Sequence, residues 1–301
     1  MSRRTRPYPD VAVGVWMAVV EPDSLVDFAR RAETAGCDSV WVPEHLIWPA
    51  TITSPYPYKD GGGPPVPSSV NLYDPWALLS AVAAVTTTIR LGTCVYVLPL
   101  RDPLVTARAV ATLDVLSNGR AILGAGLGWM KEEFDAAGID FRTRASRSDE
   151  IVPVLRSLWS QELTRASGRH INFEPLYFYP KPPQGASLPI VFGGDSEPAL
   201  RRAARLGDGW LGTWCTPTST RAYVTRLEEL LTEYGRADEP FEVTVMIKPR
   251  EVSVDLIEEL HAAGADRICI GSPTVPLAVW PEILDNLAVV LAKLRGDSAA
   301  R

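Results

Sequence analysis

The stretch Ala35-Gly-Cys-Asp-Ser-Val-Trp-Val42 returns near the end of the chain as Ala263-Gly-Ala-Asp-Arg-Ile-Cys-Ile270. In both copies a glycine ends a helical pattern, a short polar turn follows, and a buried strand begins. A looser copy lies at Leu206-Gly-Asp-Gly-Trp210. The repetition indicates a chain built from strand–helix units. Joints of this type lie at the end of a barrel that supports stability rather than catalysis.

Eight short apolar runs alternate with helical patterns along the chain. Most of the runs are continuous in hydrophobicity, which is typical of parallel strands covered on both faces. Asp74 and Asp102 each precede a proline, and Ser24 and Ser196 open further helical patterns, so all four are predicted helix caps. A strand followed by a helix, eight times over, predicts an α/β fold of the (β/α)8 TIM-barrel type. The predicted strands are Val11–Ala18, Ser39–His45, Arg90–Pro99, Arg120–Gly126, Leu188–Gly194, Gly209–Trp214, Glu242–Pro249 and Arg267–Gly271.

Two stretches interrupt this rhythm and are predicted insertions after strands two and four. Residues 49–73 are rich in proline and contain Gly61-Gly-Gly63, and residues 161–187 separate a helix from the fifth strand. The first directly follows the carboxyl end of a strand, where barrel active sites are built. A length of 301 residues fits one such barrel, so we expect a single domain over residues 1–301.

Composition excludes several classes of protein. The net charge of −6 and pI near 5.3 argue against a nucleic-acid partner. No apolar run approaches the roughly 18 residues that span a bilayer, and no signal-peptide core follows the basic start, so we expect a cytoplasmic protein. Four cysteines lie far apart and without a nearby histidine, so small buried side chains are expected rather than a metal site or disulfides. They are Cys37, Cys94, Cys215 and Cys269.

Among three histidines, His45 is the candidate for chemistry. It ends the second predicted strand, directly after Glu44, at the catalytic rim of a barrel. His261 lies in a predicted outer helix and His170 in the second insertion, so both are interpreted as structural or solvated.

Two glycine runs form a second candidate feature. Gly193-Gly-Asp-Ser196 joins the fifth strand to a helix, where backbone N–H groups suit a phosphate. A plain capped turn explains the same residues without a ligand. Gly124-Ala-Gly-Leu-Gly-Trp129 matches a dinucleotide fingerprint only loosely. No phosphate loop of the Gly-Lys-Ser type, no His-Glu-x-x-His and no Gly-x-Ser-x-Gly occurs in the chain.

In this order the motifs resemble the bacterial luciferase-like monooxygenase superfamily of flavin and deazaflavin enzymes. The resemblance extends from about residue 11 to 290 and is closest to the branch that uses coenzyme F420, a 5-deazaflavin. The motifs that carry it are residues 35–45, Ile89–Val95, Leu113–Arg120, Gly124–Trp129 with Glu132-Glu-Phe134, Gly193–Ser196 and Leu200–Trp210, together with Pro55-Tyr-Pro-Tyr58.

The resemblance implies a barrel that binds the tricyclic ring over its strand ends. Glu44 and His45 would border the ring, a cis peptide bond between Cys94 and Val95 would support its far face, and His45 would be catalytic. The cofactor phosphate would lie on the glycine turn near Thr213. The implied cofactor-binding residues are Glu44, His45, Cys94, Val95, Leu127, Gly128, Trp129, Gly193, Gly194, Asp195, Ser196 and Thr213.

One departure bears on the substrate. Sugar-phosphate dehydrogenases of this superfamily have a glutamate where Trp129 stands, which suggests an apolar substrate wall that Trp16, Trp48 and Trp214 would extend. Arg101, Arg142 and Arg147 could meet a polyglutamate tail of the cofactor, although solvated surface positions are the favoured interpretation.

We therefore expect an F420-dependent oxidoreductase that transfers hydride between the deazaflavin C5 and a small organic substrate, with His45 moving the proton. The alternative is a monooxygenase that uses reduced flavin mononucleotide (FMN) and O2 on the same barrel. A non-catalytic flavin or deazaflavin carrier is a further reading. A phosphosugar lyase or isomerase is remote, with Lys248 as its only candidate. The resemblance also suggests a homodimer.

Overall fold

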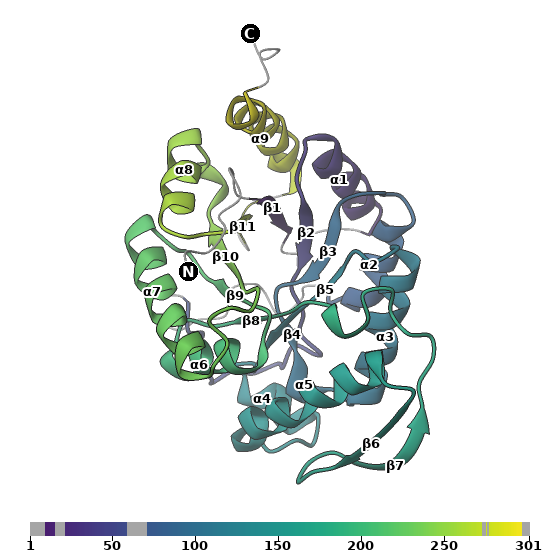
Figure 1. The fold of residues 1–301 in the computed structure, drawn as a ribbon. Coiled ribbons are helices and arrows are strands. Elements are labelled where there is room, and N and C mark those ends of the chain that lie inside the picture. Colours follow the sequence, from purple (N-terminus) through teal and green to yellow (C-terminus); the bar gives the residue numbers. More distant parts are fainter. Residues whose placement is uncertain (1–9, 16–21, 59–70, 273–274, 276, 297–301) are drawn as a thin grey trace.

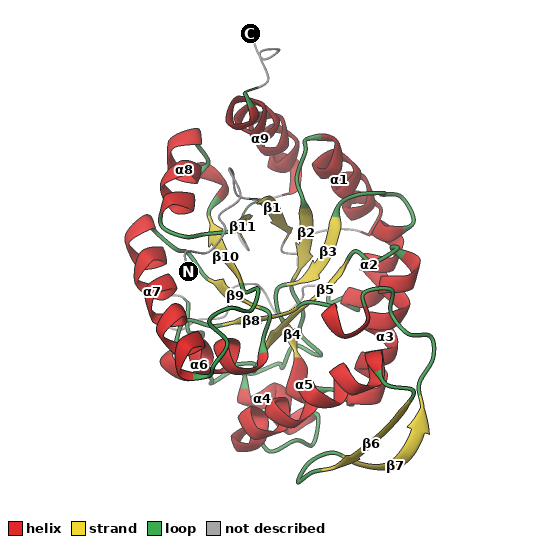
Figure 2. Ribbon diagram, viewed as in Figure 1, coloured by secondary structure: helices red, strands yellow, loops and turns green. Residues whose placement is uncertain are grey.

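Helices surround a parallel sheet in this α/β protein (Figures 1 and 2). The structure is a computed structural model that describes residues 10–15, 22–58, 71–272, 275 and 277–296. In the view of Figure 1 the strands lie at the centre, and the helices lie outside them. Along the chain, helices connect the successive strands of this sheet, as the repeated strand–helix joints predict.

Eight described strands pair in parallel, each with two others. The pairings run β1–β2–β3–β5–β8–β9–β10–β11 and return from β11 to β1. The short β4 continues β3 after a bulge and pairs with β5. These strands are β1 (Asp10–Val15), β2 (Ser39–Val42), β3 (Arg90–Thr93), β4 (Tyr96–Val97), β5 (Ala121–Gly126), β8 (Ile190–Gly193), β9 (Gly209–Gly212), β10 (Glu242–Ile247) and β11 (Arg267–Ser272).

All eight predicted strand positions are confirmed; most strands end earlier than predicted, whereas β1 begins one residue earlier, at Asp10, and β11 extends one residue further, to Ser272. The predicted end of the first strand, residues 16–18, lies outside the described residues. The second strand stops at Val42, so Glu44 and His45 follow it in a loop rather than ending it. The difference matters because a loop residue can turn its side chain to either side.

The helices are α1 (Pro22–Thr34), α2 (Pro75–Ala83), α3 (Pro103–Leu116), α4 (Lys131–Ala136), α5 (Arg144–Ser160), α6 (Glu197–Leu206), α7 (Pro217–Glu233), α8 (Val254–Ala262) and α9 (Trp280–Arg295). Asp74 and Asp102 cap α2 and α3 through their carboxylates, as predicted. Ser24 was expected to cap α1 but lies inside it, because the helix begins at Pro22. A proline at the first helical position fits there without a lost hydrogen bond.

The two irregular stretches differ in content. Residues 49–58 and 71–73, the described part of the first, contain no helix or strand. The second contains an antiparallel hairpin of β6 (Leu163–Ser167) and β7 (Asn172–Tyr177), which projects from the body in Figure 1. Neither this hairpin nor α4 is predicted from the sequence, and α4, with six residues, is too short for a periodic pattern.

One apolar side chain from each of six strands fills the space inside the sheet. These side chains are fully or almost fully buried, and Cys94 and Trp214 pack against them. Because Leu211 and Met246 also line the cavity described below, this cluster forms its floor. The six are Trp41, Ile122, Val191, Leu211, Met246 and Cys269.

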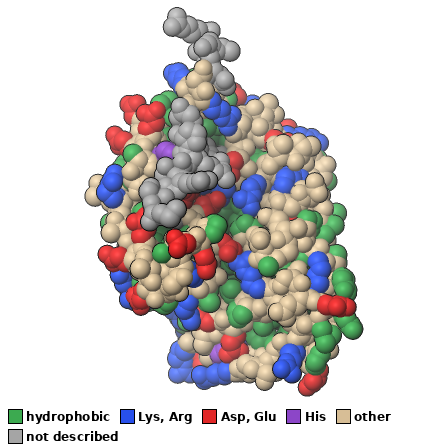
Figure 3. All heavy atoms as spheres, viewed as in Figure 1, with side chains coloured by type: hydrophobic (Ala, Val, Ile, Leu, Met, Phe, Trp, Pro, Cys, Tyr) green, Lys and Arg blue, Asp and Glu red, His purple; other side chains and the backbone are tan. Residues whose placement is uncertain are grey.

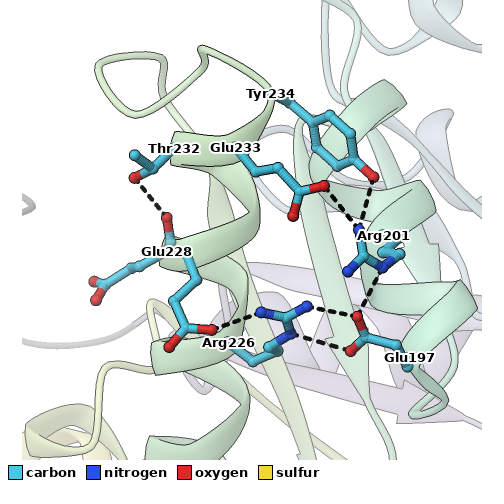
Figure 4. A network of polar contacts seen from close by, with 8 residues as sticks. Glu197, Arg201, Arg226, Glu228, Thr232, Glu233 and Tyr234 are labelled. Carbon is cyan, nitrogen blue, oxygen red and sulfur yellow. Dashed lines mark hydrogen bonds and ion pairs between the residues drawn. The ribbon is translucent and has the colours of Figure 1, made fainter.

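Ion pairs join the outer helices α6 and α7. Figure 4 shows Glu197 held by Arg226 and Arg201, while Arg201 also reaches Glu233 and Tyr234. Acidic and basic side chains are interspersed over the face seen in Figure 3. Within the described residues, no helix is both long and apolar enough to cross a membrane.

Candidate active site

A cavity of about 610 Å³ lies at the carboxyl ends of the strands. The loops after β2, β3, β5, β8 and β9 supply most of its wall. All twelve residues that the sequence assigns to the cofactor line it, from Glu44 to Thr213, and so does Trp214. Distant motifs therefore meet in one place.

The catalytic candidate His45 is held by a buried acid. Its Nδ1 lies 3.1 Å from Oε2 of Glu133, a residue of α4 with no exposed surface. The other oxygen, Oε1, accepts the N–H of Leu46 at 2.5 Å. Because a carboxylate only accepts hydrogen bonds, Nδ1 carries the proton and Nε2 is the nitrogen left for the cavity.

Glu44 lines the cavity, but its carboxylate is engaged in supporting the neighbouring bulge. Its buried carboxylate accepts the N–H of Val97 at 2.8 Å and pairs with Arg101. Burial raises the pKa of the Glu44 carboxyl, and Arg101 and the Val97 N–H oppose that shift. Arg101 is therefore not a surface arginine, because it neutralises a buried acid beside the site.

Aromatic rings surround His45. The Trp48 and Trp129 rings meet it edge-on, at centroid distances of 5.1 and 6.0 Å. Tyr56 lies 5.2 Å from Trp129 and 5.6 Å from Tyr58. Among the predicted wall residues, Trp129 and Trp214 line the cavity, whereas Trp48 stands behind His45 and Trp16 lies outside the described residues.

The bulge between β3 and β4 forms one wall of the cavity together with two glycines. The peptide bond between Cys94 and Val95 is cis, as the resemblance implies. The Val95 side chain fills the space over two glycines: a Cβ on Gly126 would come within 2.3 Å of it, and a Cβ on Gly193 within 2.8 Å. Any larger residue at either glycine would displace the bulge from the cavity.

Donors and cations gather at the start of α6. Ser196 is its N-cap but makes no capping hydrogen bond with its side chain, so the predicted cap is correct in position only. The first acid of the helix, Glu197, is tied outward to Arg226 (Figure 4). Arg144 and Arg202 line the cavity nearby.

The two arginines are close enough for repulsion. Burial and the charge of Arg202 lower the pKa of Arg144. The Arg202 Nε bonds Asp149 at 2.8 Å, and Arg144 lies over the Phe141 ring at 3.8 Å. This end of the cavity is therefore suited to an anion. It offers two neighbouring guanidinium groups, the N–H groups at the start of α6, and the Ser196 hydroxyl, which makes no capping hydrogen bond.

Asp195 lies in the same wall without a cation partner among the described residues. Its carboxylate accepts the Thr213 N–H at 3.3 Å. Burial raises the pKa of Asp195 to about 6, against that hydrogen bond. Its charge in turn helps raise the pKa of Tyr58 to about 12, after the larger effect of burial.

Several residues of the site were missed or placed wrongly from sequence. Glu133 was quoted only as part of a family motif, and Arg144, Arg202 and Tyr56 were not assigned to the cavity. The sequence offers little to assign these residues to the cavity, because they lie on helices or in a long loop rather than directly at the end of a strand. Of the proposed tail-binding arginines, Arg142 pairs with Asp140 and Arg147 bonds the carbonyl oxygens of Pro99 and Arg101.

The remaining histidines make structural contacts. His170 bonds Ser146 at 2.9 Å, and Nδ1 of His261 bonds the Ala265 carbonyl oxygen at 3.0 Å. Cys37, Cys215 and Cys269 are buried, and Cys94 is half-buried against the cavity. In the part of the chain that the structure describes, no three His, Cys, Asp or Glu side chains are grouped as metal ligands would be.

Comparison with known proteins finds relatives over most of the chain. An uncharacterized protein of Mycobacterium tuberculosis is 33% identical over 265 residues, which cover 88% of this chain and 92% of that protein. An F420-dependent glucose-6-phosphate dehydrogenase of Kineococcus radiotolerans is 34% identical over 236 residues, 75% of this chain and 64% of that enzyme.

The fold has solved counterparts. An F420-dependent secondary alcohol dehydrogenase, solved with an F420–acetone adduct, superposes with a TM-score of 0.74 at 20% identity, covering 93% of this chain and 98% of that one. At that identity the likeness concerns the fold. The family model for luciferase-like monooxygenases matches residues 6–274. The chain therefore belongs to the luciferase-like monooxygenase family.

Proposed function

We propose that this protein is an oxidoreductase that binds coenzyme F420 in the cavity and acts on a small organic substrate beside His45. The observation that carries the proposal is the His45–Glu133 pair, whose histidine lines a cavity together with the Cys94–Val95 bulge and with Arg144 and Arg202. The similarity to F420-dependent glucose-6-phosphate dehydrogenases favours the deazaflavin over FMN.

The residues present fit a planar cofactor with an anionic tail. The cis bulge at Cys94–Val95 packs on Gly126 and Gly193, and this wall suits the face of a ring. Ser196, Arg144 and Arg202 would hold the phosphate, with Thr213 beside them. Glu44 would support the cofactor indirectly, because its carboxylate accepts the N–H of Val97 and so holds the bulge in place. When bound, the deazaflavin supplies hydride transfer at its C5.

The chain's own part in catalysis is to position groups and move a proton. Glu133 holds the proton of His45 on Nδ1, so Nε2 can accept a proton from a substrate hydroxyl, or return it after protonation. The Trp48 and Trp129 rings pack edge-on against the imidazole and help to fix its orientation. Histidine suits both directions because its ordinary pKa lies near neutrality.

The strand pairings also support a specific type of α/β fold. We infer a (β/α)8 barrel in a single domain over residues 1–301, with insertions after strands two and four. The pairing of β3 with β5 and of β11 with β1 supports a closed ring.

Exposed apolar side chains on α3, Val105 and Leu116, support the proposed homodimer. Sedimentation equilibrium of the purified protein tests the homodimer directly.

Cofactor titration followed by a His45 variant tests the function. We expect F420 fluorescence to be quenched with micromolar or tighter affinity, and FMN to bind more weakly. His45→Ala should lower turnover by about 100- to 10,000-fold, the range of general acid–base catalysis, with F420 affinity almost unchanged. Preference for FMN would favour the monooxygenase. Tight F420 binding without any His45-dependent turnover would favour a carrier.

A further inference from the structure

The Tyr56 side chain is mostly buried, and its hydroxyl is a donor without a partner among the described residues. Tyr56 lines the cavity and is only 8% exposed, yet its hydroxyl makes no hydrogen bond to any described residue. The hydroxyl is not sealed in the core, in contrast to Nε1 of Trp48, which is buried without a partner. A ligand in the cavity can therefore accept a hydrogen bond from it in place of water.

Tyr56 shares a wall with the catalytic histidine. Both rings meet Trp129, at 5.2 Å for Tyr56 and 6.0 Å for His45. A molecule lying against Trp129 can therefore reach both residues. Burial also raises the pKa of the Tyr56 phenol, so the hydroxyl stays protonated and remains a donor.

The charges around this wall disfavour an anionic substrate. Among the described residues that line the cavity, the basic side chains are Arg144 and Arg202. Both lie at the end of the cavity formed by α5 and α6. Among the described residues, no lysine or arginine side chain makes a hydrogen bond or a cation–π contact with Tyr56 or Trp129. A phosphate on a substrate placed against these two rings would therefore lack a cation partner.

We propose that Tyr56 donates a hydrogen bond to the carbonyl oxygen of a neutral substrate, whose apolar body packs against Trp129. The substrate class is then a neutral ketone or enone, or the corresponding alcohol, rather than a sugar phosphate. This inference rests on the proposed function only in taking the cavity as the active site. Tyr56 thereby selects substrates by an acceptor atom, and Trp129 selects them by shape.

Binding of [carbonyl-¹³C]acetophenone tests the proposal. Difference infrared spectra with the full chain, alone and with F420, should show a carbonyl band shifted to lower frequency than in hexane. Tyr56→Phe should weaken acetophenone binding about tenfold, the equivalent of one hydrogen bond of roughly 1.4 kcal/mol, and return the band toward its hexane position. Ethylbenzene, which lacks the acceptor, should bind both proteins equally.

The matched control is Tyr177→Phe, the same chemical change at a 67% exposed position on β7. It should bind acetophenone like the wild type. The proposal is overturned if the wild type binds no acetophenone at millimolar concentration, if it prefers glucose 6-phosphate, or if its carbonyl band is unshifted. It is also overturned if Tyr56→Phe weakens F420 alone, because the hydroxyl would then serve the cofactor. Failure of F420 to bind sinks the proposed function, and the measurement on the chain alone still decides the role of Tyr56.

Discussion

Both ends of the strand assembly contain buried polar groups, but these groups have charged partners at one end and lack them at the other. At the amino ends, Arg267 is 1% exposed and bonds Asp38 at 2.9 Å and Glu242. At the carboxyl ends, the Tyr56 hydroxyl and the Asp195 carboxylate have no charged partner among the described residues. The first end therefore holds the fold, whereas the second keeps hydrogen-bonding capacity for a ligand.

The comparison separates stability from chemistry. A buried charge whose partners surround it is costly to disrupt but offers nothing to a ligand. A half-satisfied polar group is costly to keep, and it persists where a ligand completes its bonds. Substitutions at the two ends should therefore change different measurements.

Arg267→Met should give the largest loss of stability. It leaves Asp38 and Glu242 without their shared guanidinium, which should lower the free energy of unfolding by about 3–5 kcal/mol. F420 affinity of the protein that remains folded should stay within about twofold. Urea unfolding measures the loss. Arg226→Met, in the exposed network of Figure 4, is the matched control and should cost clearly less. Equal losses would erase the contrast between the buried and exposed arginines.

Glu133→Gln should impair chemistry more than folding. The glutamine carbonyl can still accept the Leu46 N–H, but its NH2 group then faces Nδ1 of His45 and favours the proton on Nε2. We expect kcat to fall about 100-fold, because a histidine in the wrong tautomer cannot take the substrate proton. ¹⁵N NMR of His45 reports the tautomer, which loss of packing alone would not exchange.

Glu150→Gln is the control for Glu133→Gln. Like Glu133, Glu150 accepts backbone N–H groups, here from Arg169, His170 and Ile171, but it does so at the turn that joins β6 to β7, away from the cavity. Its kcat should match the wild type. An unchanged Nδ1 proton in Glu133→Gln, together with normal turnover, would show that the pair only packs.

The sequence predicts the strand frame well because each strand is a local pattern with its own punctuation. The runs at residues 39–45 and 267–271 are rich in apolar residues and follow a glycine-ended helix, and strands form there over Ser39–Val42 and Arg267–Ser272. The twelve cofactor residues were predicted from the resemblance to a family, and all of them line the cavity because they lie at or after strand ends. The strand prediction alone uses only neighbouring residues.

The partners of those residues could not be predicted in the same way. Glu133 reaches His45 across 88 residues of sequence, and Arg101 reaches Glu44 across 57. Such contacts depend on how α4 and the bulge fold back over the strand ends, which no local pattern encodes. Tyr56 is similar, because its burial depends on loop contacts made by its neighbours.

Asp195 should make cofactor binding depend on pH. With a pKa of about 6 it is neutral at pH 5 and charged at pH 7.5, beside the proposed phosphate position. We expect F420 affinity to fall roughly three- to tenfold between these pH values, as for a weakly screened like charge. Fluorescence titration measures it, and Asp195→Asn should flatten the profile. A profile that is identical in the variant would assign the dependence to another group.

The same titration affects folding in a stated direction. The folded pKa of Asp195 lies above its ordinary value of 3.8, so the folded state holds its proton more tightly. The contribution of this group to stability therefore falls as pH rises from about 4 to about 6, and it is constant above that range. Urea unfolding at pH 4.5 and 7 compares the wild type with Asp195→Asn.

The smallest effect should come from the anchor of the loop that carries Tyr56. Glu132 accepts the N–H groups of Thr53 and Ser54, at 2.7 and 3.0 Å, and these bonds lower its pKa to about 2 against the opposing effect of burial. Glu132→Gln should leave global unfolding almost unchanged, because the site is at the surface. Amide exchange at Thr53 and Ser54 should become about fivefold faster, as expected for a weakened surface hydrogen bond. Acetophenone should bind slightly more weakly, because Tyr56 is then less firmly placed beside Trp129. If exchange accelerates and binding does not change, Tyr56 is held by its ring contacts alone.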